Sequence, residues 1–382
     1  MKLLHFADIH IGMENYAKLD PQTGLSTRLL DFLKTFDFIV DTAIENQVDA
    51  VVFAGDAYKT RDPNPTQQRG FGERIKKIAK AGIPVVLVVG NHDTPNAEGK
   101  ANTLDIYSAL EIDNVWVSRK PELLKIPTKS GTLQVITLPW LHKDEYKTVG
   151  DKLKSLYDKI TPKSPAIFLS HCEVEGASYG SEKGMAIGND VTVPLPLLQD
   201  RRLSYVALGH IHKHQVLSKD PLVVYAGSPH RIDFGEEKEE KGICLVEIAK
   251  TTNFQFIPTN CRRFLSIDID LKANDSNPTQ TILDEISKHD VADKVVRLTL
   301  NIPADLEQNL EMDKIKKALS SAHYIAGISR NVERKERLKI DGQEEVERLT
   351  PVEALQSYFK AKKFSAEKIK TLEKFAAQLL ES

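Results

Sequence analysis

Cysteine is scarce in this sequence: only Cys172, Cys244 and Cys261 occur in 382 residues, and they form no Cys-x-x-Cys pair. This spacing argues against a zinc knuckle or a disulfide framework and favours buried or half-buried thiols in a reducing compartment. Long apolar runs are missing as well: none approaches the roughly 18 residues of a membrane span, and polar residues interrupt the N-terminus before a signal-like stretch can form. We therefore expect a cytoplasmic protein without a membrane partner.

The chain also lacks an excess of charge of one sign. Lys plus Arg number 52 and Asp plus Glu number 54, which gives a net charge of −2. Bulk electrostatics therefore attract neither nucleic acid nor membranes, and any DNA binding must come from local patches. No GxxxxGKS or GxxxxGKT segment occurs, so ATP dependence would have to come from a partner. The length allows two or three domains with a sizeable core.

What the sequence does contain is five short polar blocks, each at the end of an apolar run. The runs are short and rich in β-branched residues, as buried strands are, and read KLLHFA, AVVFA, PVVLVV, AIFL and YVAL. The blocks that follow them are Asp8-Ile9-His10, Gly55-Asp56, Gly90-Asn91-His92-Asp93, Ser170-His171 and Gly209-His210-Ile211-His212. Open α/β sheets place their sites at the carboxyl ends of strands. The blocks therefore predict a two-metal hydrolytic site.

The donor types in these blocks restrict the metal. An aspartate such as Asp56 can bridge two cations, while neutral imidazoles and an amide oxygen complete each shell without much added negative charge. A set of oxygen and nitrogen donors without thiolate favours manganese or iron over a soft metal. We therefore expect two Mn²⁺ ions, with Fe²⁺ or Mg²⁺ as alternatives.

Strands alternate with helices over the first two thirds of the chain. Residues 28–47, 65–81 and 144–159 predict helices between the apolar runs, and such alternation is typical of a layered α/β domain. Because the second half of this region holds more strands than helices, we expect two packed sheets flanked by helices.

The remaining residues predict three further parts. Residues 263–335 follow a β-α-β-α-β pattern, a small α/β cap, and residues 336–349 are charge-dense like a solvated linker. Thr350 to Glu353 form a capping box and Ser365 resembles a second N-cap, so residues 350–382 predict two short amphipathic helices. These cannot bury a core alone and must dock on this protein's own body or on another chain. We thus expect a layered α/β first domain over residues 1–262, followed by the cap, the linker and the helical segment.

Taken together, the motifs resemble those of the calcineurin-like metallophosphoesterases and, within them, the SbcD family of DNA double-strand-break repair nucleases. The narrower resemblance is carried by DIHIG, GDAYKTRDPNPT, GNHD, LSHCEVEGA, ALGHIHKHQ and GSPHRIDFGEEKEEKG. These segments span residues 1 to about 250, and the last, Gly227 to Gly242, is the most specific. The cap and the C-terminal helices match in layout only.

The resemblance implies roles for the residues of the blocks. Asp8, His10 and His212 would hold one metal, Asn91, His171 and His210 the other, and Asp56 would bridge them. His92 would act on the substrate as general acid or as a contact to the transition-state phosphate. Asp93 would fix the orientation of His92, or would merely cap its turn. An activated water would attack phosphorus in line.

Other residues near the motifs have less certain roles. His214, His230 and Asp233 are candidates for groups around the metal ligands or at the substrate's edge, with an ordinary surface position as the alternative. Lys59 departs from the family pattern, which often has His or Asp three residues after the bridging aspartate. Lys59 and Arg61 either contact DNA phosphate or belong to a solvated loop.

The function that the resemblance implies is a manganese-dependent DNA nuclease. It would act as an exonuclease on double-stranded ends and an endonuclease on single strands or hairpins, as the subunit of an ATP-dependent repair complex. One alternative is another phosphoesterase of the same fold, acting on phosphoproteins, cyclic nucleotides or lipid phosphodiesters. The other is a non-catalytic scaffold, which the retention of all seven ligand positions argues against.

The expected partners are DNA, an SbcC-like coiled-coil ATPase docked on residues 350–382, and a second copy of the chain. The resemblance implies pairing through the helices at about 65–81 and 101–111. Phe71, Ile75, Leu104 and Tyr107 are the candidate contacts there, with an intramolecular core as the alternative for all four.

Overall fold

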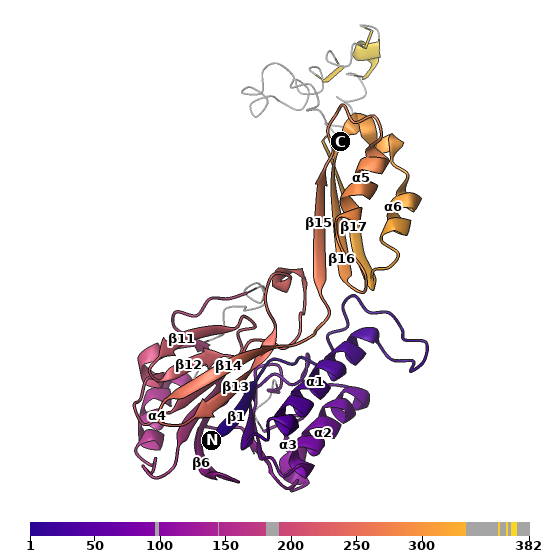
Figure 1. The fold of residues 1–382 in the computed structure, drawn as a ribbon. Coiled ribbons are helices and arrows are strands. Elements are labelled where there is room, and N and C mark those ends of the chain that lie inside the picture. The colour runs from indigo at the N-terminus through magenta and orange to yellow at the C-terminus, as the bar shows by residue number, and fades with distance from the viewer. Residues whose placement is uncertain are drawn as a thin grey trace.

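The computed structural model describes residues 1–95, 99–143, 145–180 and 191–333, with short pieces at 358–359, 364–365 and 368–372. Within these residues two six-stranded sheets, flanked by helices, make up the larger part of the fold, and a smaller sheet with two helices follows (Figure 1). This is the α/β arrangement of two packed sheets that the sequence predicts. None of the described helices has the length and apolar content needed to cross a membrane.

The first sheet contains the apolar runs from the first third of the chain. Strands β1, β2, β3 and β4 are parallel, β13 runs antiparallel to β1, and β14 runs antiparallel to β13 at the edge. In spatial order the strands are β14 (Thr252–Pro258), β13 (Gly242–Ile248), β1 (Lys2–Phe6), β2 (Ala50–Phe53), β3 (Val85–Val88) and β4 (Val115–Ser118).

The second sheet is built from the middle of the chain. Strands β6, β7, β10 and β12 are parallel, and each edge carries one antiparallel strand. The order is β11 (Gln215–Lys219), β12 (Leu222–Tyr225), β10 (Tyr205–Gly209), β7 (Ala166–His171), β6 (Gly131–Leu138) and β5 (Glu122–Thr128). A small separate pair is formed by β8 (Glu173–Val174) and β9 (Thr192–Val193).

The predicted helices are present with small shifts at their ends. They are α1 (Thr27–Glu45), α2 (Pro65–Lys80) and α4 (Val149–Tyr157), which follows the short 3₁₀ turn η1 (Glu145–Thr148). The helix that the resemblance implies at about 101–111 is present as the shorter α3 (Asp105–Ala109). The side chain of Ser26 caps α1, and Asn64 forms a capping box with Gln67 ahead of Pro65 in α2. These side-chain bonds satisfy amide groups that the first helical turn leaves free.

Alternating residues of the strands build three buried layers. Leu4 and Phe6 face the side of α1, α2 and α3, whereas Leu3 faces the second sheet. On the far side of the second sheet, Phe168 and Leu208 pack with residues of α4. Successive side chains in a strand point to opposite faces. Because apolar residues occupy both odd and even positions of these strands, each sheet is buried on both sides. The two sheets are therefore held face to face, with their strand ends aligned at common edges.

The candidate dimer contacts lie inside this core. Phe71, Ile75 and Leu104 are fully buried and Tyr107 nearly so, all within the layer between the helices and the first sheet. Positions four apart on a helix share a face, and in α2 that face packs on the strands. The prediction that these four residues form intermolecular contacts is therefore wrong, and the intramolecular alternative holds.

Residues 264–333 form a separate three-stranded sheet with its own core. The elements are β15 (Phe264–Asp270), α5 (Pro278–Ser287), β16 (Val295–Pro303), η5 (Ala304–Asn309), α6 (Met312–Ala318) and β17 (Tyr324–Glu333). The strands are parallel in the order β15-β16-β17, and the helices cover one face (Figure 1). The β-α-β-α-β pattern is thus present. Its status as a domain with the boundaries 263 and 335 stays a prediction.

The predicted linker at 336–349 lies outside the described residues, as does most of the 350–382 segment. Two of its described contacts are the stacking of Phe359 on Phe364, with ring centroids 5.9 Å apart, and a bond from the Ile369 amide to the Ser365 carbonyl at 3.0 Å. The second joins residues four apart in the sequence, and its acceptor Ser365 is the residue where a cap was expected. The docking role of the segment stays a prediction.

Candidate metal centre

The polar blocks meet where the carboxyl ends of the two sheets face each other. β1, β2 and β3 supply one side, and β7 and β10 supply the other. Close approach demands glycine here: a Cβ at Gly209 would lie 2.1 Å from the Ala54 carbonyl oxygen, and a Cβ at Gly90 would lie 2.1 Å from Asp56 Oδ1. Glycine at these positions therefore lets the strand ends come close enough for side chains from both sheets to share a site.

The backbone at this edge is unusual. Asp8, His10, Asp56 and His210 have φ angles of 52°, 52°, 61° and 98°, in a region that residues with a Cβ rarely adopt. Such conformations cost of order 1–3 kcal/mol each and persist only where the surroundings impose them. Their concentration among the predicted site residues makes this edge the candidate site.

One group of donors consists of Asp8, His10 and His212. Nε2 of His10 and Nε2 of His212 are 3.0 Å apart, and the three side chains offer donor atoms that all lie within 4.8 Å of one another. All three residues are buried. Nδ1 of His10 is buried and has no hydrogen-bond partner. A cation between the two Nε2 atoms would bind the electron pairs that otherwise face each other.

The second group consists of Asn91, His171 and His210. Asn91 Oδ1 lies 2.8 Å from Nε2 of His171 and 3.3 Å from Nδ1 of His210. Nδ1 of His171 donates to the Ala54 carbonyl at 2.7 Å. In the neutral ring this bond leaves an electron pair on Nε2, directed at the amide oxygen of Asn91, which is the tautomer that a metal ligand needs.

Asp56 lies between the two groups. Its Oδ2 is 3.6 Å from Nε2 of His10 and 3.4 Å from Nε2 of His171, and its Oδ1 accepts the His92 amide at 2.9 Å. Burial acts to raise the pKa of Asp56, but the imidazoles of His171 and His92 outweigh it and hold the pKa well below its usual range. The carboxylate is thus charged and placed where it can reach both groups.

The neighbouring titratable groups respond to the same crowding. Burial, only partly offset by His171 and His212, raises the pKa of Asp8 to about 6. For His171 burial acts to lower the pKa, but Asp56 and Asp8 outweigh it and raise the pKa to about 9. In the metal-free chain, therefore, a proton on His171 compensates part of the negative charge that cations would otherwise neutralise.

His92 is positioned differently from the expectation. Its Nδ1 donates to the Lys59 carbonyl oxygen at 2.8 Å, which leaves Nε2 as the ring nitrogen available for other contacts. Asp93 does not orient it. Instead the Asp93 carboxylate accepts the amides of Asp56 and Ala57, from the turn after β2, and of Gly90, from the turn after β3. The turn-capping alternative for Asp93 is correct.

Geometry also admits a role for His92 that was not expected. His10, Asp56 and His92 form a further group whose donor atoms lie within 4.8 Å of one another. The His10 and His92 rings meet edge to face, with centroids 4.8 Å apart. His92 therefore belongs to the cluster. The Mn²⁺ affinity of a His92 variant distinguishes a metal ligand from a group that contacts only the substrate.

The three outlying candidates do not join the cluster. The His230 ring stacks on Phe32 with centroids 4.3 Å apart, His214 stacks on Phe256 at 4.2 Å, and Asp233 caps the 3₁₀ turn η4 (Phe234–Glu236). Arg61 bonds to the Thr94 carbonyl. The contacts of the three candidates are thus ring packing and turn formation, and that of Arg61 is a bond to a backbone carbonyl.

Sequence reasoning missed Glu236. Its Oε1 accepts Nδ1–H of His212 at 2.8 Å, and its Oε2 lies 3.1 Å from the ammonium of Lys241. The signal was available, because Glu236 belongs to the Gly227–Gly242 segment that carries the narrowest part of the resemblance. What the sequence lacked was any indication of which acidic residue in GEEKEEKG turns inward.

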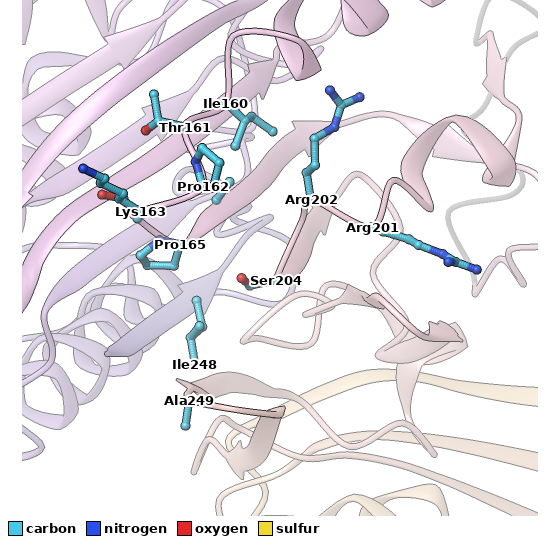
Figure 2. A pocket seen from close by; sticks show the side chains of 12 residues that line it. Ile160, Thr161, Pro162, Lys163, Pro165, Arg201, Arg202, Ser204, Ile248 and Ala249 are labelled. Atoms are coloured by element: carbon cyan, nitrogen blue, oxygen red, sulfur yellow. The ribbon is translucent and has the colours of Figure 1, made fainter.

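A cavity of about 430 Å³ lies at the opposite ends of the strands. It is lined by residues that lead into β7, residues that lead into β10, Ile248 at the end of β13, and Ala249. Lys163 and Arg201 supply positive charge, but their side chains point in different directions (Figure 2). This cavity is far along the strands from the polar blocks and does not gather groups for catalysis.

The buried His and Asp clusters are consistent with a dimetal site. The donors are imidazole, carboxylate and amide, and no thiolate is among them, since all three cysteines are buried elsewhere and free. Such donors suit first-row divalent metals, and the set does not by itself distinguish manganese from iron.

Comparison with known families agrees with this chemistry. The family described as calcineurin-like phosphoesterase matches residues 1–214. The chain belongs to that family.

Two curated relatives have more specific names, and their sequence identity to this chain is low. The chain is 26% identical over 273 residues to the SbcD subunit of the SbcCD nuclease of Bacillus subtilis, covering 65% of this chain and 66% of the relative. It is 27% identical over 257 residues to the DNA double-strand break repair protein Mre11 of Sulfurisphaera tokodaii, covering 65% and 60%. The chain therefore spans less than two thirds of the length of these two relatives. A dimetal phosphatase structure from Danio rerio aligns with a TM-score of 0.41 at 10% identity, over 67% of this chain and 95% of that chain.

Proposed function

We propose that this protein is a manganese-dependent DNA nuclease that hydrolyses phosphodiesters at a two-metal site. The observation that carries the proposal is the position of Asp56, which lies 3.6 Å from His10 in one donor group and 3.4 Å from His171 in the other. Similarity to SbcD and Mre11 proteins supports DNA as the substrate.

In this proposal Asp8, His10 and His212 hold one metal ion, Asn91, His171 and His210 hold the second, and Asp56 bridges them. When bound, two such ions polarise the phosphoryl oxygens and lower the pKa of the attacking water. Asn91 offers an oxygen donor, and Ala54 and Glu236 fix which ring nitrogens of His171 and His212 are free to bind.

His92 acts on the substrate side. The Lys59 carbonyl accepts from Nδ1 of His92, so Nε2 is left to give a proton to the leaving oxygen or to contact the phosphate. Because a backbone carbonyl carries no charge, it orients the ring without stabilising the imidazolium as a carboxylate would. Lys59 thus contributes through its main chain, and its side chain remains a candidate for phosphate contact.

The wider assembly belongs to the same proposal. Residues 1–262 act as nuclease domain and 263–335 as cap, and the segment 350–382 docks an SbcC-like coiled-coil ATPase through two amphipathic helices. A homodimer is also expected, with contacts other than the four buried residues. Light scattering tests the dimer, and co-elution with the ATPase before and after deletion of residues 350–382 tests the docking.

One assay tests the activity. The full chain is incubated with linear duplex DNA, a hairpin, a single strand, and a small chromogenic phosphodiester, each with Mn²⁺, with Mg²⁺ or with EDTA. We expect cleavage of DNA with Mn²⁺ and less with Mg²⁺, whose strict octahedral geometry suits imidazole-rich sites poorly. Hydrolysis of the small ester without cleavage of any DNA would favour a different phosphoesterase. Inactivity on all substrates despite metal binding would contradict the proposal.

A further inference from the structure

The buried carboxylate of Glu236 connects a donor group of the metal centre to the rest of the fold. Its side chain has no solvent exposure. One oxygen accepts from Nδ1 of His212 at 2.8 Å, while the other accepts the Ile232 amide at 2.8 Å and lies 3.1 Å from the Lys241 ammonium. Every one of these contacts is to a hydrogen-bond donor, so the carboxylate is satisfied and fixed.

This contact decides the state of His212. A carboxylate can only accept, so Nδ1 of His212 carries the proton. In the neutral ring the electron pair then sits on Nε2, the atom 3.0 Å from Nε2 of His10. Histidine ligands commonly have such a carboxylate partner, which fixes the tautomer and ring orientation.

The turn that carries Glu236 is fixed by the 264–333 unit. Glu237, the next residue, accepts from the Ser266 amide at 2.9 Å and from its hydroxyl at 2.6 Å. At the start of the turn, Phe234 packs edge-on against Phe264, and the Arg297 guanidinium lies 4.4 Å above its ring. Residues of η4 and its C-cap Glu237 thus contact the metal centre on one side and β15 and β16 on the other.

We propose that Glu236 is a positioning residue for the metal ion held by Asp8, His10 and His212, and that the 264–333 unit helps to keep it in place by clamping η4. The inference rests on the metal centre of the proposed function and not on DNA as the substrate.

Binding of Mn²⁺ alone tests it. The full-length variants Glu236→Leu and Glu236→Gln are titrated with Mn²⁺ by calorimetry, and the spin-coupled signal of a manganese pair is followed by electron paramagnetic resonance. Glu239→Gln is the matched control, because Glu239 is the other acidic partner of Lys241, at 2.7 Å. The thermal unfolding of each metal-free variant is recorded in EDTA.

We expect Glu236→Leu to weaken one of the two binding steps by ~10–100-fold, the usual effect of removing such a partner. The other step and the control should stay close to the wild type. Glu236→Gln keeps an acceptor for Nδ1–H and the side-chain volume, and should recover most of the affinity. Equal weakening of both steps, or unchanged binding in Glu236→Leu, would overturn the proposal. Wild-type protein that binds no Mn²⁺ would overturn the proposed function as well.

The clamp has its own variant. Glu237→Gln removes the charge that holds Ser266 while leaving Glu236 intact, so it should weaken the same binding step as Glu236→Leu by a smaller factor. Lys238→Gln, on the next residue, is the control for altered surface charge. Weakening of the other step, or no difference between Glu237→Gln and Lys238→Gln, would remove the 264–333 unit from the proposal.

Discussion

The two ends of the paired sheets are built from the same strands yet differ in almost every physical property. At the carboxyl ends, Asp8, Asp56 and Asp93 are at most 2% exposed. At the other end, Arg202 forms ion pairs with Asp158 and Asp200 that remain open to solvent, at 2.9 and 2.8 Å.

The two ends therefore differ in their electrostatics: one has solvent-exposed ion pairs, and the other has buried charges close together. Exposed pairs such as Arg202–Asp158 contribute about 0–1 kcal/mol because water screens them. Buried carboxylates among imidazoles shift one another's pKa values, and such shifts concentrate at functional sites. Left-handed backbone at Asp8, His10, Asp56 and His210 adds a steric cost at the same edge. The carboxyl edge therefore sacrifices stability to bring donors together, and substitutions at the two edges should have very different effects.

The largest effect is expected at Asp56. Asp56→Asn removes the charge between the two donor groups, so we expect Mn²⁺-dependent hydrolysis to fall by at least about a thousandfold. Calorimetry should also detect loss of at least one bound Mn²⁺. Asp200→Asn at the opposite edge is the control and should leave both quantities unchanged. Retention of two tightly bound ions in Asp56→Asn would contradict the bridging role.

The next effect is expected at His92. His92→Gln should lower kcat by about 10²–10⁴-fold, the usual range for loss of a general acid. The affinity for Mn²⁺ should stay within about threefold of the wild type, which corresponds to a change in binding free energy well below about 1.4 kcal/mol. The exposed residue His289 supplies the control variant His289→Gln. Because His92 also lies near His10 and Asp56, parallel loss of bound Mn²⁺ and activity would instead make it a metal ligand.

A smaller effect should follow from crowding the edge. In Gly90→Ala the new Cβ would meet Asp56 Oδ1 at 2.1 Å, so the turn must shift. Overpacking of this kind costs about 1–3 kcal/mol, measurable by urea unfolding in EDTA. At Gly150, by contrast, a Cβ would meet nothing within 4 Å, and Gly150→Ala serves as the matched control. Equal stability of the two variants would show that the carboxyl edge is not tightly packed.

The smallest effect concerns pH and a residue between the edges. Burial lowers the pKa of His5 from 6.5 to about 3; the side chain lies near Tyr205 Oη and the Leu208 carbonyl. Below pH 6.5 the unfolded chain therefore binds a proton that the folded chain does not. The free energy of unfolding contributed by His5 is complete above pH 6.5 and falls as the pH decreases toward 3, by at most about 1.4 kcal/mol per pH unit.

The comparison is urea unfolding of wild type and His5→Gln at pH 7 and pH 5, both in EDTA. Wild type should lose more stability than His5→Gln over this interval, because glutamine does not titrate. Identical losses would mean that His5 is not held neutral in the fold.

Much of the fold was predictable because its signals are local. Short β-branched runs and helical periodicity placed β1, β2, β3, β7, β10 and three of the helices. Because successive residues in these runs are apolar, the runs indicated strands buried on both faces. The position of Asp8, Asp56, Asn91, His171 and His210 at or just beyond strand ends followed from the same runs, since the carboxyl ends of parallel strands share an edge.

Contacts between distant segments could be decided only by the tertiary structure. Packing of the sheets brought Asn91 to His171 and Asp56 between the donor groups. Phe71 and Tyr107 turned inward because α2 and α3 lie on the first sheet. The Lys59 carbonyl, rather than Asp93, orients His92, and Glu236 rather than another acid of its run reaches His212. A sequence pattern specifies which way a side chain alternates along its own strand or helix. The partner it meets depends on how separate layers pack, which no local period encodes.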